Sequence, residues 1–173
     1  MSSVRLSDIM RRDLDVDPFV TGVTADSRKV DKGTLFCALP GSAIDGRDFI
    51  PQALAKGAAA VLAPDDTQTP ESADSLLVRV SDVRRAYALA ARNFYGAQPK
   101  TCVAVTGTNG KTSVATFCRQ IFATLGRKSA SMGTLGVVTS DVDGTETPIT
   151  GPGLTTPDAA DMARHLANLA ADG

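Results

Sequence analysis

A short glycine-containing loop between an apolar run and an amphipathic run constrains the fold more than any other feature. The chain reads TCVAVT at 101–106, GTNGKT at 107–112 and SVATFCRQIF at 113–122. A strand, a glycine loop and a helix in this order can bind phosphate, because loop amides and the positive N-terminal end of the helix face the same anion. The sequence therefore predicts an α/β unit built around a phosphate site.

The loop departs from the standard phosphate-loop pattern, which would place a glycine where this chain has Val105. The other elements are present. Lys111 is positioned to bridge the outer phosphates, and Thr112 can offer its hydroxyl to the Mg²⁺ that a triphosphate carries. Gly107 and Gly110 permit close backbone approach. A surface lysine after an ordinary glycine turn is the alternative, but the strand-loop-helix context favours a nucleotide site.

Composition excludes several other function classes. Hydrophobic residues make up 43% and charged residues 21%, which is typical of a soluble globular protein, and the net charge of −1 gives no field for nucleic acid or membranes. The three cysteines, Cys37, Cys102 and Cys118, have no disulfide or zinc spacing. The N-terminus has no apolar segment of a signal peptide. We expect a cytoplasmic protein that binds its anion locally, with no nucleic-acid or membrane partner.

Turn residues and apolar periodicity predict alternating strands and helices before residue 97. We expect strands at 34–39, 59–63 and 75–80, and helices at 49–56 and 81–96. Ser81 is the candidate N-cap of the second helix, and Gly57 and Gly96 are candidate helix ends. Four apolar residues of that helix recur at core-facing spacing: Val83, Tyr87, Ala90 and Phe94.

The Gly/Pro-containing break GAQPK at 96–100 predicts a boundary between two domains, 1–98 and 99–173. The second should contain a strand at 101–106, the loop, a helix, a strand at 129–134 and a hairpin turning at Asp143-Gly144. The expected core stripe of the helix after the loop, which Gly126 ends, consists of Val114, Phe117, Cys118, Ile121, Phe122 and Leu125.

A last helix follows TTPD, with Thr156 as the expected N-cap and Pro157 as its first residue. Its expected apolar face consists of Met162, Leu166 and Leu169. His165, the only histidine, lies in this helix without partners at metal-ligand spacing, so we expect it to be structural. The segment has too few elements for a parallel sheet covered on both faces, which predicts that it is the first part of a larger domain.

Several motifs together resemble the Mur ligase family. The loop T-G-T-N-G-K-T is similar to that of Mur ligases and of their relative folylpolyglutamate synthetase. TADSRKVDKGTLFCALPG at 24–41 and DGRDFIPQALAKGAAAVLAP at 45–64 resemble the family's N-terminal uridine-nucleotide domain. SASMGTLG at 129–136 and GLTTPDA at 153–159 resemble its central domain. The order of these motifs covers nearly the whole chain.

The resemblance implies an α/β fold, with a small uridine-nucleotide-binding domain at 1–98 and the start of the ATP-binding domain at 99–173. It implies an ATP- and Mg²⁺-dependent ligase that adds an amino acid, meso-diaminopimelate or L-lysine, to UDP-N-acetylmuramoyl-L-alanyl-D-glutamate through an acyl phosphate. The family's other Mg²⁺ ligands, carbamylated lysine and amino-acid-specifying motif lie beyond residue 173, so we expect these 173 residues alone to be inactive.

The resemblance also implies roles for individual residues. Lys111 is the expected catalytic residue and Thr112 the expected metal ligand. The ATP-binding residues it implies are Gly107, Thr108, Asn109, Gly110, Lys111, Thr112 and Ser113. The substrate-binding residues it implies are Ala25, Ser27, Ser42, Ala43, Ile44, Thr155 and Thr156. Some family members carry a histidine near 42–44, where this chain has none.

Two other functions stay open at this level. The chain can be a module that binds a UDP-sugar without turnover, or a relative of folylpolyglutamate synthetase that shares only the ATP loop. The separate domain before the loop favours a Mur ligase over the folate enzyme, whose relatives generally begin close to the ATP domain.

Overall fold

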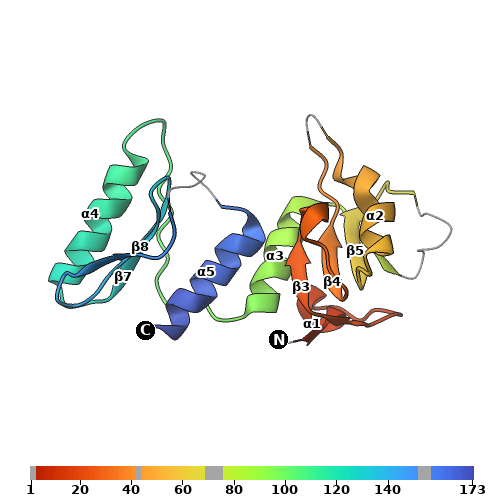
Figure 1. The fold of residues 1–173 in the computed structure, drawn as a ribbon, viewed down its shortest axis with the longest axis horizontal. Helices are drawn as coiled ribbons and strands as arrows, with labels where there is room; N and C mark the ends of the chain where they lie inside the picture. Colours follow the sequence, from red (N-terminus) through yellow and green to blue (C-terminus); the bar gives the residue numbers. More distant parts are fainter. Residues whose placement is uncertain (1–2, 42–43, 69–75, 152–156) are drawn as a thin grey trace. The chain divides into compact units, whose positions relative to one another are not determined.

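The protein is an α/β protein, described here from a computed structural model for residues 3–41, 44–68, 76–151 and 157–173. The chain forms two compact units, Met1–Gly96 and Ala97–Gly173. Figure 1 shows a parallel sheet with helices in the first unit and a hairpin sheet with two helices in the second. Each unit is described by itself.

The first unit is built on a four-stranded parallel sheet in the order β3-β4-β5-β6. These strands are β3 (Gly22–Thr24), β4 (Thr34–Cys37), β5 (Ala60–Pro64) and β6 (Leu77–Val80). Every residue of β4 is buried, as its short apolar run requires of a strand covered on both faces. The structure confirms the three strands expected at 34–39, 59–63 and 75–80, although Ser75 lies outside the described residues.

Helices cover both faces of this sheet (Figure 1). On one face, Ile50 and Ala53 of α2 (Ile50–Ala55) pack with Phe36 and Val61. A 3₁₀ turn, η2 (Gly46–Phe49), leads into α2. On the other face, α3 (Val83–Tyr95) contacts β3 and β5.

Helix α3 begins one residue later than predicted. Its N-cap is Asp82, whose carboxylate accepts a hydrogen bond from the Arg85 N–H at 2.9 Å, so the prediction of Ser81 was wrong. A carboxylate at this position satisfies a free amide of the first turn and also faces the positive end of the helix. The predicted stripe is largely confirmed: the buried residues are Val83, Tyr87, Ala90 and Ala91, while Phe94 is half-buried.

Three elements that precede β3, like β3 itself, had not been predicted. They are β1 (Val4–Arg5), α1 (Leu6–Met10) and β2 (Phe19–Val20), which pairs antiparallel with β1. Asp17 accepts hydrogen bonds from the N–H and hydroxyl of Ser7 at 2.8 and 2.9 Å, which lower the pKa of its carboxyl group. Asn93 of α3 donates to the Ile9 carbonyl at 2.8 Å, so α1 is attached to the core helix.

The second unit contains a three-stranded antiparallel sheet in the order β7-β8-β9. Its strands are β7 (Ser129–Gly133), β8 (Gly136–Ser140) and β9 (Glu146–Pro148), and its helices are α4 (Lys111–Thr124) and α5 (Ala159–Ala171). The Gly144 N–H donates to the Asp141 carbonyl at 3.0 Å in the turn between β8 and β9. The predicted strand at 129–134 and the hairpin at Asp143-Gly144 are therefore confirmed.

The strand predicted at 101–106 is absent, and this prediction was wrong. A strand requires a partner that accepts its backbone hydrogen bonds, and within the described residues no strand pairs with this segment. Val103 is 70% exposed. An apolar run of strand-like composition therefore remains irregular where no partner strand is at hand.

The apolar stripe of α4 also differs from expectation. Four residues expected in the core are 46–67% exposed: Val114, Phe117, Ile121 and Leu125. Cys118 and Phe122 are half-buried. The helix buries Arg119 and Ala123 instead, and it contacts β7 and β8. The antiparallel sheet therefore covers a different face of α4 from the one that the apolar spacing indicated.

Helix α5 begins at Ala159, with Asp158 accepting from the Ala160 N–H at 2.9 Å. Pro157 is therefore not its first residue, and the cap expected at Thr156 lies outside the described residues. The expected face of Met162, Leu166 and Leu169 is half-buried. No helix in the described ranges is long and apolar enough to cross a membrane.

Candidate functional site

The glycine loop ends at the N-terminus of α4, as the sequence predicted. Gly110 is the N-cap residue at φ 79°, and no side chain caps the first turn of the helix. The first amides of a helix have no partner within the helix, so an uncapped N-terminus presents N–H donors together with the positive end of the helix dipole. This geometry suits a phosphate group.

Lys111, the first residue of α4, lies over this loop. Its ammonium group donates to the main-chain carbonyl of Gly107 and, at 3.3 Å, to that of Thr108. The lysine is thus beside the loop rather than in the core, where a charge would be costly. It can exchange these carbonyls for phosphate oxygens by a change of side-chain rotamer.

Thr112 has a hydroxyl partner from the hairpin. Its Oγ1 lies 3.0 Å from Oγ1 of Thr134, which stands in the turn between β7 and β8. Thr134 could not be predicted from sequence, because a contact between residues 22 positions apart leaves no spacing signal. The hydrogen bond restricts the rotamer of the hydroxyl that is expected to face Mg²⁺.

The donor set fits a metal that arrives with a nucleotide. Within the described residues, no group of three or more His, Cys, Asp or Glu side chains could hold a metal ion. Mg²⁺ keeps several waters and is commonly bound through substrate phosphates with few protein ligands. The hydroxyl of Thr112 and a triphosphate held at the uncapped helix end are compatible with that mode of binding.

Buried Arg119 fixes α4 to the hairpin sheet. Its guanidinium group donates to Ser131 Oγ at 3.1 Å and to Ser140 Oγ, and pairs with Glu146 at 3.0 Å. Hydrogen bonds from Arg119 and Gln120 lower the pKa of the Glu146 carboxyl group. These contacts hold the helix of the loop against β7, β8 and β9.

In the first unit, the predicted substrate residues follow two adjacent strands. Ala25 and Ser27 come after β3, and Ile44 comes in the connection after β4. Because β3 and β4 are parallel neighbours, their carboxyl ends lie at one edge of the sheet, which is where ligands bind in open α/β folds. Ser42 and Ala43 lie outside the described residues.

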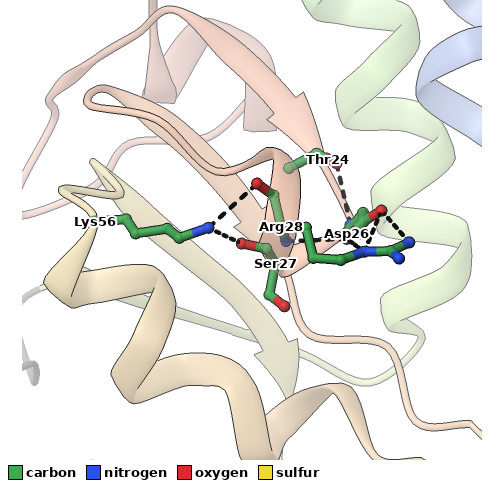
Figure 2. A network of polar contacts seen from close by, with 5 residues as sticks. All are labelled: Thr24, Asp26, Ser27, Arg28 and Lys56. Atoms are coloured by element: carbon green, nitrogen blue, oxygen red, sulfur yellow. Dashed lines mark hydrogen bonds and ion pairs between the residues drawn. The ribbon is translucent and has the colours of Figure 1, made fainter.

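The turn that carries Ser27 is fixed by a network of polar contacts (Figure 2). Asp26 accepts from the Arg28 N–H at 2.9 Å and pairs with its guanidinium group at 2.8 Å, and hydrogen bonds from Arg28 lower the pKa of Asp26 to about 2. The Thr24 hydroxyl accepts from the Asp26 N–H at 3.1 Å. Lys56 donates to the carbonyls of Ser27 and Arg28. The role of Lys56 could not be predicted from sequence, since a single surface lysine forms no pattern.

The connection after β4 turns back tightly before α2. The Gly46 N–H donates to the Leu39 carbonyl at 3.0 Å, and a Cβ added to Gly46 would lie 2.6 Å from that oxygen. Asp45 pairs with Arg47 at 2.6 Å, which lowers the pKa of the Asp45 carboxyl group. Ile44 is 64% exposed beside this turn.

The sequence singled out three residues of the last segment, Thr155, Thr156 and His165. Thr155 and Thr156 lie outside the described residues. His165 is half-buried in α5, and it belongs to no group of possible metal ligands in the described part of the chain.

Comparisons with known proteins extend over both units. The family model "Mur ligase family, catalytic domain" matches residues 19–95, and the model "Mur ligase middle domain" matches residues 105–173. A UDP-N-acetylmuramoyl-L-alanyl-D-glutamate--2,6-diaminopimelate ligase of Caulobacter vibrioides is 61% identical over 96% of this chain and 34% of the relative. The ligase of the same name from Rhizobium meliloti is 49% identical over 89% of this chain and 30% of the relative.

Solved structures show the same likeness. One described as the structure of a UDP-N-acetylmuramoyl-L-alanyl-D-glutamate--2,6-diaminopimelate ligase has a TM-score of 0.78 and 27% identity, over 99% of this chain and 34% of that chain. MurF from Acinetobacter baumannii, at a TM-score of 0.53 and 20% identity over 73% of this chain and 29% of that chain, shares the fold. The chain spans about a third of the length of the curated relatives it matches. With models of two successive Mur ligase domains matching most of its residues, the chain belongs to the Mur ligase family.

Proposed function

We propose that this chain supplies the uridine-nucleotide-binding and ATP-loop segments of an amide ligase that adds meso-diaminopimelate to UDP-N-acetylmuramoyl-L-alanyl-D-glutamate in the cytoplasm. The observation that carries the proposal is the uncapped N-terminus of α4 with Lys111 and Thr112, in a chain 61% identical to a ligase of that name. Residues 1–98 bind the UDP moiety and residues 99–173 provide the ATP loop. L-Lysine is the alternative amino acid.

Amide formation from a free carboxylate requires activation. ATP, as a substrate, transfers its γ-phosphoryl group to the D-glutamyl carboxylate, which gives an acyl phosphate and ADP. The amine then attacks the acyl carbon, phosphate leaves with one former carboxylate oxygen, and the amine loses a proton. Because two anions must meet in the first step, most of the catalytic contribution of the protein is charge neutralisation and alignment.

The residues of the loop have distinct roles in this step. The loop amides of 107–113 and the N-terminus of α4 hold the phosphates, and Lys111 neutralises charge that develops on the transferring group. Thr112, with its rotamer restricted by Thr134, would contribute a hydroxyl ligand to Mg²⁺, and the ion would supply positive charge at the phosphates. Ala25, Ser27, Ser42, Ala43 and Ile44 bind the uridine end of the other substrate, and Thr155 and Thr156 contact its muramoyl-dipeptide end.

A chimera tests the proposal. This chain replaces the matching third of the Caulobacter vibrioides ligase, and amide product is measured with ATP, Mg²⁺, UDP-N-acetylmuramoyl-L-alanyl-D-glutamate and either diaminopimelate or lysine. We expect product with diaminopimelate, and a loss of about 10³-fold or more in rate for Lys111→Ala. Lys100→Ala, which removes an exposed lysine before the loop, is the matched control and should retain the rate. A folded chimera without product, or with equal rates for both lysine variants, would contradict the proposal.

A further inference from the structure

Lys56 connects helix α2 to a segment almost thirty residues earlier in the chain. It is the C-cap residue of α2, and its ammonium group donates to the Ser27 carbonyl at 2.9 Å and to the Arg28 carbonyl at 3.2 Å. Figure 2 shows the side chain reaching from the end of the helix to both carbonyls of the turn. One lysine therefore clamps two successive peptide groups.

These carbonyls belong to the 3₁₀ turn η1 (Ser27–Lys29), which follows β3. The turn is closed on its other side by Asp26, whose carboxylate accepts from the Arg28 N–H, and by the Lys29 N–H, which donates to the Asp26 carbonyl at 3.0 Å. Lys56 supplies donors to carbonyls that a three-residue turn does not satisfy internally. The backbone around Ser27 is thus held from two elements.

The contact fixes a position rather than balancing a charge. Both acceptors of Lys56 are main-chain oxygens, while the carboxylate of Asp26 is engaged by Arg28. Arg28 directs its guanidinium group to solvent, with its side chain 86% exposed. Hydrogen bonds to a charged donor are stronger than neutral ones, so the clamp has an appreciable effect even at a solvated site.

The contacts of Lys56 fix the main chain at Ser27. Ser27 is 8% exposed, and Figure 2 shows its side chain pointing away from Lys56 while its carbonyl points toward it. Within the described ranges, its hydroxyl has no protein hydrogen-bond partner to fix it. The position of its Cβ is therefore determined by the backbone that Lys56 holds.

We propose that Lys56 is a positioning residue for the nucleotide site: it holds the β3–η1 turn so that Ser27 meets the uridine moiety at a preset position. This inference rests on the proposed uridine-nucleotide site. A preformed turn avoids the ordering cost that a mobile turn would incur on binding. Lys56 does not touch the ligand itself.

The experiment measures binding of UDP-N-acetylmuramoyl-L-alanyl-D-glutamate to the 173-residue chain by calorimetry, for wild type and for Lys56→Met, Lys56→Gln and Lys56→Arg. Met keeps the apolar stem and removes the donors, so we expect binding weaker by about five- to tenfold. Gln retains neutral donors and should be intermediate, and Arg, with donors for both carbonyls, should restore most of the affinity. Lys32→Met, which removes an exposed lysine charge elsewhere in this unit, should bind as wild type.

A second readout needs no ligand. Hydrogen exchange of the Lys29 amide, which closes the turn, should be faster in Lys56→Met and near the wild-type rate in Lys56→Arg and Lys32→Met. The thermal midpoint of each variant is measured to check that the variant is folded. If wild type does not bind the nucleotide, the proposed function of this unit fails and the inference fails with it. If wild type binds and Lys56→Met binds equally well, or if the Lys29 amide exchanges at the wild-type rate, only the role of Lys56 is overturned. A loss of affinity that Lys56→Arg does not restore would also overturn it.

Discussion

Replacement of Arg119 by leucine should destabilise the second unit strongly, although the residue is a charged side chain on a helix. The Arg119 side chain is only 3% exposed, and its contacts reach all three strands of the hairpin sheet. Leucine fills part of the volume and leaves the hydrogen-bond partners behind. The loss in the free energy of unfolding therefore depends on how well each former hydrogen-bond partner of Arg119 can be solvated.

The three partners differ in that respect. Ser140 is 2% exposed, so loss of its partner costs about 1–3 kcal/mol. Ser131 is half-buried and loses one bond of about 1 kcal/mol. Glu146 is 42% exposed and can be solvated, so its contribution is about 0–1 kcal/mol. The expected loss in the free energy of unfolding is about 2–5 kcal/mol.

The aromatic content of the chain allows the two units to be followed separately. There is no tryptophan, and both tyrosines, Tyr87 and Tyr95, lie in the first unit. Urea unfolding monitored by tyrosine fluorescence reports that unit alone, whereas far-UV circular dichroism reports both. Arg119→Leu should shift part of the dichroism transition to lower urea and leave the tyrosine transition in place.

The matched control is Arg164→Leu in the same unit, since Arg164 makes a surface pair with Asp161 and is 52% exposed. That pair should contribute no more than about 0.5 kcal/mol. If Arg119→Leu shifted the transition no more than Arg164→Leu, the buried network would not be what holds α4 to the sheet, and the reasoning would be refuted.

Three further predictions concern the first unit. The pKa of Asp26 lies near 2, below its ordinary value, so the stability that its pairing with Arg28 contributes is complete above about pH 4 and is lost as the pH falls toward 2. An NMR titration of the Asp26 carboxyl group should show a midpoint near pH 2. The same midpoint in Arg28→Leu would contradict the assignment of the low pKa to Arg28. In urea unfolding, Asp82→Ala should lower the free energy of unfolding by about 1 kcal/mol and Ser81→Ala should leave it almost unchanged. Equal losses in the two variants would contradict the assignment of Asp82 as the only N-cap of α3. Gly46→Ala should lower the thermal midpoint by several degrees, because its Cβ would meet the Leu39 backbone at 2.6 Å; an unchanged midpoint would mean that the turn can open at no cost.

The sequence predicts the parallel sheet well because its signals are local. Each of the three strands predicted in the first unit is a compact apolar run between turn residues, and each finds a neighbour in the same unit, as Phe36 does opposite Val61. The run at 101–106 has the same composition and forms no strand. Pairing is a property of two segments, and periodicity in one segment cannot report whether a second is available.

In the candidate site, too, features with a local sequence signal could be predicted, and features that depend on contacts between distant segments could not. The position of the loop, with Gly110 and Lys111 at the start of α4, was predicted from sequence, because a glycine turn stands directly before an amphipathic run. Thr134, Arg119 and Lys56 could not be found, because each acts through a contact between segments distant in the chain. The apolar stripe that includes Phe117 was correctly identified as one face of a helix, but spacing alone does not say which face the neighbouring sheet covers.

The central claim is that this chain holds ATP so that its γ-phosphoryl group activates a carboxylate. Oxygen transfer in the Caulobacter vibrioides chimera tests it most directly. The D-glutamyl carboxylate of the UDP-linked substrate is labelled with ¹⁸O, and the phosphate released during ligation to diaminopimelate is analysed by mass spectrometry. We predict one ¹⁸O atom in the phosphate for each amide formed from doubly labelled carboxylate, and neither product at an appreciable rate in Lys111→Ala. Amide formation with unlabelled phosphate, or labelled phosphate at an undiminished rate in Lys111→Ala, would contradict the account.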